Sequence, residues 1–161
     1  MFKSLRLVPV IIYSVVAAVL FAIPLIIFLQ DTTFSHAWLL YLGNFLFMCA
    51  IAVYMIMFNA KKDENAATVS LLSTGHVVTA LGVIISVILA FIALSVFVPG
   101  IFSSTPDKVL ENAPAQVEGR HTNGLVFMVF MNAIVGNVST GSFVSIILAY
   151  YQKRDQTKEG F

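Results

Sequence analysis

Long apolar stretches alternate with short polar segments along the chain, and four of the stretches are long enough to cross a membrane. They cover residues 7–29, 37–58, 67–98 and 125–151. An α-helix rises about 1.5 Å per residue, so about 20 apolar residues cross a hydrocarbon core about 30 Å thick. The polar segments after the first two stretches are short, and each should therefore join antiparallel neighbours. The pattern predicts an all-α membrane protein with one domain, residues 1–161, whose four transmembrane helices form an up-down antiparallel bundle.

The composition removes the other broad classes of protein. Hydrophobic residues make up 59% of the 161 residues and charged residues 11%, whereas a soluble domain has about 25% charged residues. So few charges could not cover a water-soluble globule of this size, which excludes a soluble enzyme, a disordered chain and a disulfide scaffold. The net charge of +1 offers no strong field for nucleic acid. We expect the lipid bilayer to be the main partner, and no nucleic acid partner.

Basic residues gather on one side of the predicted bundle. Seven of the nine flank the spans on that side: Lys3, Arg6, Lys61, Lys62, Lys153, Arg154 and Lys158. The other two, Lys108 and Arg120, lie between the third and fourth spans. Because Lys and Arg are retained on the cytoplasmic side, both termini are predicted to be cytoplasmic, in a bacterial inner membrane. Trp38 and Tyr41 then lie at the outer interface, which aromatic side chains prefer.

The segment of about residues 99–124 is predicted to be a loop on the outer side. Prolines at positions 99, 106 and 114 prevent a continuous helix there. Thr105 and Pro106 have the residue types of an N-cap and a first helical position, which predicts a short surface helix over 105–111. The carboxylates of the loop lie too far apart to indicate an ion site and should be solvated: Asp107, Glu111 and Glu118. The length of the loop makes it the expected docking surface outside the membrane.

The fourth span carries the clearest pattern of small and polar residues. One row recurs every fourth residue and therefore follows one helix face: Ala133, Asn137, Gly141, Ser145 and Ala149. A second row lies beside it: Asn132, Gly136 and Thr140. The third span has a matching row and adjacent small residues: Gly75, Thr79 and Val83, with Gly82, Ser86 and Ala90. Small residues let helix backbones approach closely, so these rows predict tight packing of the third and fourth spans.

The same polar residues allow a second interpretation, in which Asn132, Asn137, Ser139 and Thr140 line a polar pathway or a solute pocket. No Asp, Glu, Lys or Arg lies inside any span, although proton pumps and ion-coupled carriers place such residues there. Helix packing is therefore the favoured interpretation. His76 lies near the cytoplasmic start of the third span. We expect an interfacial or hydrogen-bonded histidine there, and a proton relay or a ligand is the alternative.

The sequence contains no motif for catalysis or cofactor binding. It lacks a glycine-rich phosphate loop, a Cys-x-x-Cys pair and a His-Glu-x-x-His motif. His36 and His121 lie on the outer side, opposite His76, so haem held by two histidines is not expected. We expect no enzyme activity, no metal and no cofactor. The large residues of the second span surround their helix and are interpreted as lipid contacts: Phe45, Phe47, Met48, Met55, Met57 and Phe58.

Three segments carry a likeness to a known family. A basic stop, Asn-Ala-Lys-Lys-Asp, follows the second span at residues 59–63; small and polar residues between Ser70 and Gly82 start the third span; and basic residues follow Gly141–Ala149. On the basis of these segments, and over about half of the chain, the sequence resembles a bacterial family of uncharacterised four-span membrane proteins, a domain of unknown function. The resemblance implies a four-span fold and no particular activity, because none is assigned to that family. The outer loop of this chain is richer in proline.

These features favour a non-catalytic protein that serves as an accessory or scaffolding subunit of a larger bacterial inner-membrane assembly. The supporting features are the missing catalytic motifs, the short cytoplasmic segments and the small-residue packing face. Its partner would be another membrane protein or further copies of the same chain. The alternative is a channel or carrier for a small solute that uses the polar face of the fourth span. A third interpretation is a regulator that acts at the membrane surface through the outer loop.

Overall fold

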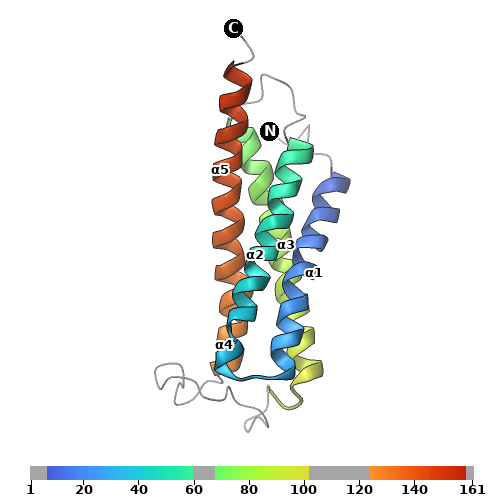
Figure 1. The fold of residues 1–161 in the computed structure, drawn as a ribbon. Helices are drawn as coiled ribbons and strands as arrows, with labels where there is room; N and C mark the ends of the chain where they lie inside the picture. Colours follow the sequence, from blue (N-terminus) through green and yellow to red (C-terminus); the bar gives the residue numbers. More distant parts are fainter. Residues whose placement is uncertain (1–6, 60–67, 102–123, 159–161) are drawn as a thin grey trace.

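The computed structural model describes residues 7–59, 68–101 and 124–158, and every regular element in these ranges is helical (Figure 1). The elements are α1 (Leu7–Gln30), the 3-10 turn η1 (Phe34–His36), α2 (Trp38–Tyr54), the π-helical segment η2 (Met55–Asn59), α3 (Thr68–Phe97), α4 (Gly124–Met131), the π-helical segment η3 (Asn132–Gly136) and α5 (Asn137–Lys158). The last three form one uninterrupted rod. Four helical stretches are long and apolar enough to cross a membrane, which confirms the predicted all-α, four-span fold.

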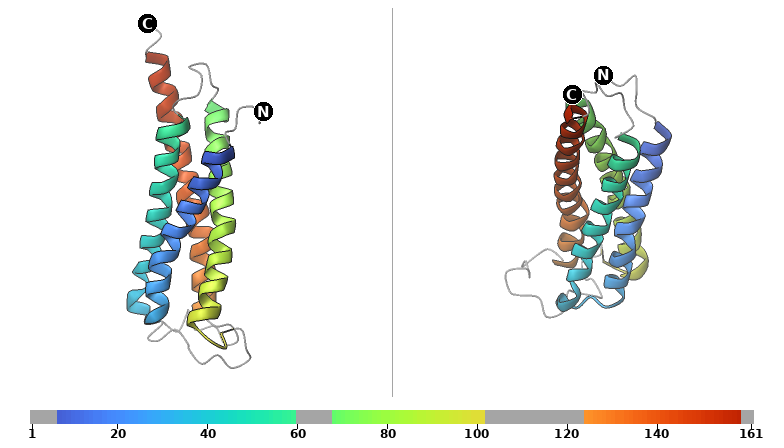
Figure 2. Two further views of the ribbon diagram at one scale, coloured as in Figure 1. Left: turned by 90° about the vertical axis from the view of Figure 1, so that its right-hand side faces the viewer. Right: turned by 45° about the horizontal axis from the view of Figure 1, so that its top comes forward.

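The four rods run up and down, and the start of α1 lies at the same end of the bundle as the end of α5 (Figures 1 and 2). Around the bundle the order is α1, α2, α5 and α3, so α1 and α5 each contact both α2 and α3. Helices α2 and α3 are antiparallel but face each other across the diagonal, with few contacts. The expectation that they are neighbours is therefore wrong.

The length of the connection explains why this expectation failed. Residues 60–67 join α2 to α3, and an extended chain spans about 3.3 Å per residue, or about 26 Å for such a segment. Packed helices lie about 8–10 Å apart, so the diagonal of a four-helix bundle is about 13 Å. A short connection can therefore reach the diagonal position as easily as the adjacent one.

Large apolar side chains from α1 and α2 fill the centre of the bundle, among them Phe21 and Phe47, which are 0% exposed. Gly82 of α3 leaves the space for Phe47, since a Cβ at Gly82 would lie 2.9 Å from Cε2 of that ring. Phe47 and Met55 are both fully buried, so the interpretation of these two residues as lipid contacts is wrong. Phe45 and Met57 are exposed on the outside of the bundle.

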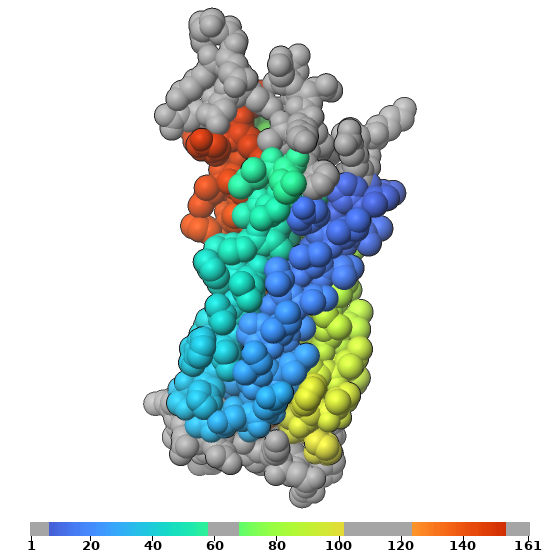
Figure 3. All heavy atoms as spheres, turned by 45° about the vertical axis from the view of Figure 1, so that its right-hand side comes forward, coloured from blue at the N-terminus to red at the C-terminus, as the bar shows by residue number. Residues whose placement is uncertain are grey.

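Helix α1 covers the line between α2 and α3 on one face of the molecule, and its outward side chains present an apolar surface (Figure 3). The contact with α3 is anchored by the buried Ser14, whose hydroxyl lies 2.8 Å from the carbonyl oxygen of Val10 and 3.0 Å from that of Val78. Helix α1 continues through Pro24, which is buried.

A tight turn ends α3. The N–H of Ile101 donates to the carbonyl oxygen of Val98 at 3.1 Å, and Gly100 between them has a φ of 74°. Pro99 and Gly100 are the residue types that a type II turn requires at its two central positions. The predicted short helix over 105–111 and the carboxylates of the outer loop, Asp107, Glu111 and Glu118, lie outside the described residues.

Candidate functional site

The first polar row of the fourth span faces α3. A Cβ built at Gly141 would lie 2.5 Å from Cγ2 of Thr79, and a Cβ at Gly75 would lie 2.5 Å from Oγ of Ser145. Real Cβ atoms do not come this close to another heavy atom, so each glycine is required for the contact. The two helices therefore meet at two glycines, one contributed by each helix, and the two contacts lie about one helical turn apart.

Gly82, another small residue of α3, has its nearest neighbours on α1 and α2 and not, as the sequence pattern had suggested, on the fourth span. A Cβ at Gly82 would meet the ring of Phe47 in α2 and, at 3.5 Å, the carbonyl oxygen of Ser14 in α1. Gly82 therefore serves the centre of the bundle, and its nearest neighbours do not belong to the fourth span. Ser86 is 0% exposed, and its hydroxyl oxygen has no hydrogen-bond partner in the part of the chain that the structure describes.

The second polar row faces α2 and contacts an asparagine that the sequence analysis did not single out. Nδ2 of Asn44 donates to Oδ1 of Asn132 at 2.9 Å, and both residues are buried, at 5% and 9% exposed. A Cβ at Gly136 would overlap the amide of Asn44, so the glycine makes room for the pair. A single amide in the otherwise apolar second span was the available signal, because buried amides in membrane helices seek partners on neighbouring helices.

The orientation of the Asn44 and Asn132 amides is fixed by a hydrogen bond from Asn132 to a backbone carbonyl of its own helix. Nδ2 of Asn132 donates to the carbonyl oxygen of Met128 at 2.9 Å, so its Oδ1 must point toward Asn44. Asn44 must then present its own Nδ2 to Asn132, which leaves Oδ1 of Asn44 on the other side without a partner among the described residues. The pair is thus asymmetric, with one buried acceptor unused.

The side chain of Asn137 supplies a hydrogen bond to a backbone carbonyl of the π-helical segment η3. The N–H of Asn137 donates to the carbonyl oxygens of Asn132 and Ile134 and so does not serve the carbonyl of Ala133, its partner in a regular α-helix. The side-chain Nδ2 of Asn137 donates to that carbonyl instead, at 3.2 Å. Inside a membrane no water is available for an orphaned carbonyl, and this side chain therefore supports the π turn.

A second π-helical segment, η2, also has an amide from the fourth span on its first carbonyl. Nε2 of Gln152 donates to the carbonyl oxygen of Met55 at 2.6 Å, and Gln152 is 8% exposed. Gln152 lies just beyond the stretch predicted as the fourth span, residues 125–151, and its position in the sequence indicates no role. Each π turn thus occurs where a side-chain amide supplies a hydrogen bond, and π turns inside α-helices are frequent at functional sites.

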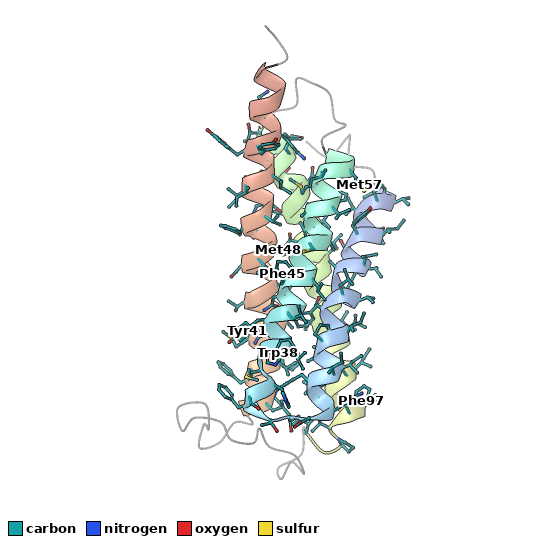
Figure 4. All side chains as sticks on the ribbon, viewed as in Figure 1. Trp38, Tyr41, Phe45, Met48, Met57 and Phe97 are labelled. Carbon is teal, nitrogen blue, oxygen red and sulfur yellow. The ribbon has the colours of Figure 1, made fainter. Side chains whose placement is uncertain are left out.

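A groove of about 480 Å³ lies between α2 and the fourth span, beside the asparagine pair. Its walls are apolar and consist of Phe45 and Met48 on α2 with Met131 and Val135 on the fourth span. Tyr41, Phe45 and Met48 follow one side of α2, with Trp38 beyond them at the end of the helix (Figure 4). Polar groups line the remainder: the asparagine pair, Tyr41, Ser139 and Thr140. The groove is therefore an apolar slot with uncharged polar groups on its floor.

The other candidate residues lie apart from this groove. Nδ1 of His76 is 3.0 Å from the carbonyl oxygen of Leu72 in its own helix, and His76 is half-buried. At the far end of α1, a hydrogen bond of 2.6 Å from Thr33 lowers the pKa of Asp31, and His36 at 3.1 Å contributes to the same shift. Within residues 7–59, 68–101 and 124–158, no three His, Cys, Asp or Glu residues group together.

The fold and the groove define a multi-pass membrane protein with a four-helix bundle. No family model, no curated protein and no solved structure matches the chain. Its function is therefore argued from its own residues.

Proposed function

We propose that the protein is a non-catalytic integral membrane subunit with an accessory or scaffolding role in a larger assembly of the bacterial inner membrane. Both termini are proposed to be cytoplasmic, because seven of the nine basic residues flank the spans on that side. The observation that carries the proposal is how the hydroxyl groups of the bundle are used.

Three hydroxyls at the contacts of α3 and the fourth span bond back to their own helices. Ser145 donates to the carbonyl oxygen of Gly141 at 2.7 Å, Thr79 to that of Gly75 at 2.9 Å, and Thr140 to that of Gly136 at 3.0 Å. All three acceptors are glycines at close helix contacts. These three hydroxyls therefore use their hydrogens within the closely packed helices, which supports a structural role over a water-filled pathway.

A channel or carrier for a small solute is the second candidate, and one observation favours it. Buried oxygens of Asn44, Ser86 and Asn137 lack hydrogen-bond partners among the described residues. Unpaired polar atoms inside a membrane are costly unless water or a solute reaches them. In this alternative the three residues mark a polar route through the bundle.

Purification from native membranes in a mild detergent separates the two proposals. A subunit should elute with other membrane proteins at constant stoichiometry, and the purified chain in vesicles should pass no small neutral solute above the rate of empty vesicles. Gly141→Leu, which disrupts the contact with α3, should release the partners. A chain that elutes alone, and whose solute flux is removed by Asn137→Ala in a folded protein, would instead establish the channel or carrier and refute the subunit role.

A further inference from the structure

One residue that lines the groove between α2 and the fourth span carries an unused acceptor. Asn44 lines the groove and is only 5% exposed, and its Oδ1 has no hydrogen-bond partner among the described residues. Thr140, which also lines the groove, has committed its hydroxyl hydrogen to the carbonyl oxygen of Gly136 at 3.0 Å. Its oxygen keeps lone pairs that can accept. Both oxygens can thus accept from a donor, which the hydrocarbon of lipid chains does not supply.

The charge and size of the groove define the occupant further. None of the described residues places a charged side chain along it, and a charged occupant would be costly at this depth. The volume of about 480 Å³ falls within the range of about 300–1,000 Å³ that small-molecule sites occupy, which typically combine apolar walls with a few polar groups. We propose that the groove binds a neutral membrane-soluble molecule with an apolar body and a hydroxyl group.

The walls and floor have separate tasks in binding this molecule. Phe45, Met48, Met131 and Val135 enclose its apolar body, and the oxygen of Thr140 accepts a hydrogen bond from its hydroxyl. Oδ1 of Asn44 is enclosed in the present conformation, so it accepts the same donor only when the amide turns toward the groove and gives up its hydrogen bond to Oδ1 of Asn132. A Cβ at Gly136 would overlap this amide, so the glycine allows Asn44 to lie at this position beside the groove. Binding at this groove is independent of the subunit role.

Photolabelling with two matched probes tests the site. Decanol carrying a diazirine is compared with its methyl ether, which has the same apolar body and no donor. In the purified full-length protein, decanol should label the groove walls, and unlabelled decanol should compete while the ether does not. Dioctanoylglycerol, a neutral lipid with a free hydroxyl, competes if lipids are a source of this ligand; failure of this competitor alone restricts the site to simpler alcohols.

Two exposed positions of the same helix provide the variant and its control. Val135 lines the groove and is 49% exposed, whereas Val138 is 43% exposed and does not line it. Val135→Phe should fill the slot and abolish the saturable labelling, and Val138→Phe should leave it unchanged. Both positions face outward, so neither change should affect folding.

The polar contact has its own matched pair. Thr140→Val keeps the shape of the side chain and removes its oxygen, which should weaken competition by decanol about fivefold, the equivalent of one hydrogen bond. Thr140→Ser should retain the wild-type affinity. Equal labelling by alcohol and ether, or labelling that Val135→Phe leaves intact, would overturn the proposal. Labelling in the purified protein that is blocked in native membranes by a cross-linked protein would overturn it too, in favour of a partner helix.

Discussion

The contact between α3 and α5 is close enough for a single methyl group at Gly141 to disturb it. Gly141→Ala places a Cβ 2.5 Å from Cγ2 and 2.7 Å from Oγ1 of Thr79, whereas ordinary contacts begin near 3.4 Å. The shortfall is 3.4 − 2.5 = 0.9 Å. Thr79 cannot turn away freely, because its hydroxyl is bonded to the carbonyl oxygen of Gly75 at 2.9 Å and its β-branched side chain has few rotamers.

Helix separation or loss of the Thr79 hydrogen bond must absorb this overlap. Overpacking of a well-packed interior costs about 1–3 kcal/mol, and we expect Gly141→Ala to fall in that range and Gly141→Leu to exceed it. Thr79→Ala removes the two atoms that clash. The double variant should therefore be about 1–2 kcal/mol more stable than the sum of the single changes.

Unfolding in mixed micelles of increasing SDS content, followed by circular dichroism, measures these differences. Val138→Leu is the matched control, since Val138 is 43% exposed and an added methylene there should change stability by less than about 0.5 kcal/mol. A Gly141→Ala protein as stable as the wild type, or single changes that simply add, would show that the two helices are not in close contact at this point.

Three further predictions concern other parts of the chain. Asn137→Ala should cost about 1 kcal/mol in the same unfolding assay, less than Gly141→Leu, because it orphans a carbonyl but also removes a buried oxygen without a partner; a larger loss than in Gly141→Leu would contradict this order. A cysteine-accessibility reporter at Gln116 should be labelled from outside the cell and one after Lys158 only from the cytoplasm, and the reverse pattern would refute the orientation. The Thr33 hydrogen bond lowers the pKa of Asp31 below its ordinary 3.8, so the ionised Asp31 carboxylate stabilises the fold above about pH 3.8, and this stabilisation is lost as the pH falls through the lowered pKa. Unfolding measured between about pH 5 and about pH 2 should therefore depend less on pH in Asp31→Asn than in the wild type. An identical dependence in the two proteins would exclude a contribution from this carboxylate.

The four spans could be predicted because length and hydropathy alone decide whether a helix can cross a bilayer. The stretch expected over 7–29 is the helix Leu7–Gln30, and the one expected over 67–98 is Thr68–Phe97. Neighbour relations were less accessible, since connections of this length fit either an adjacent or a diagonal helix. The π turns could not be predicted either. The donor to η2, Gln152, reaches its carbonyl only after the helices have packed, and an asparagine four residues after a carbonyl, as at η3, does not by itself indicate a π turn.

The polar rows of the fourth span show what residue spacing in the sequence can predict and what it cannot. Residues spaced by four necessarily share a face, but the spacing does not say which helix that face meets. In the structure Gly141 meets α3, whereas Gly136, which is five residues earlier and so about 140° away around the helix axis, meets Asn44 of α2. Asn44 stands alone among apolar residues in its own span, so only the fold brings it to Asn132.

The two faces of the fourth span also differ in whether their polar atoms have hydrogen-bond partners. Against α3, the hydroxyls of Thr79 and Ser145 each have a backbone acceptor in their own helix, and these two groups require nothing more. Against α2, the asparagine pair satisfies Oδ1 of Asn132 and leaves Oδ1 of Asn44 unpaired, beside a groove. Replacing such a pair with apolar residues would often be tolerated in a purely structural contact. An unpaired acceptor kept beside an open, uncharged slot is better explained by a molecule that donates to it, and the side of the bundle formed by α2 and the fourth span is therefore where a function should be sought first.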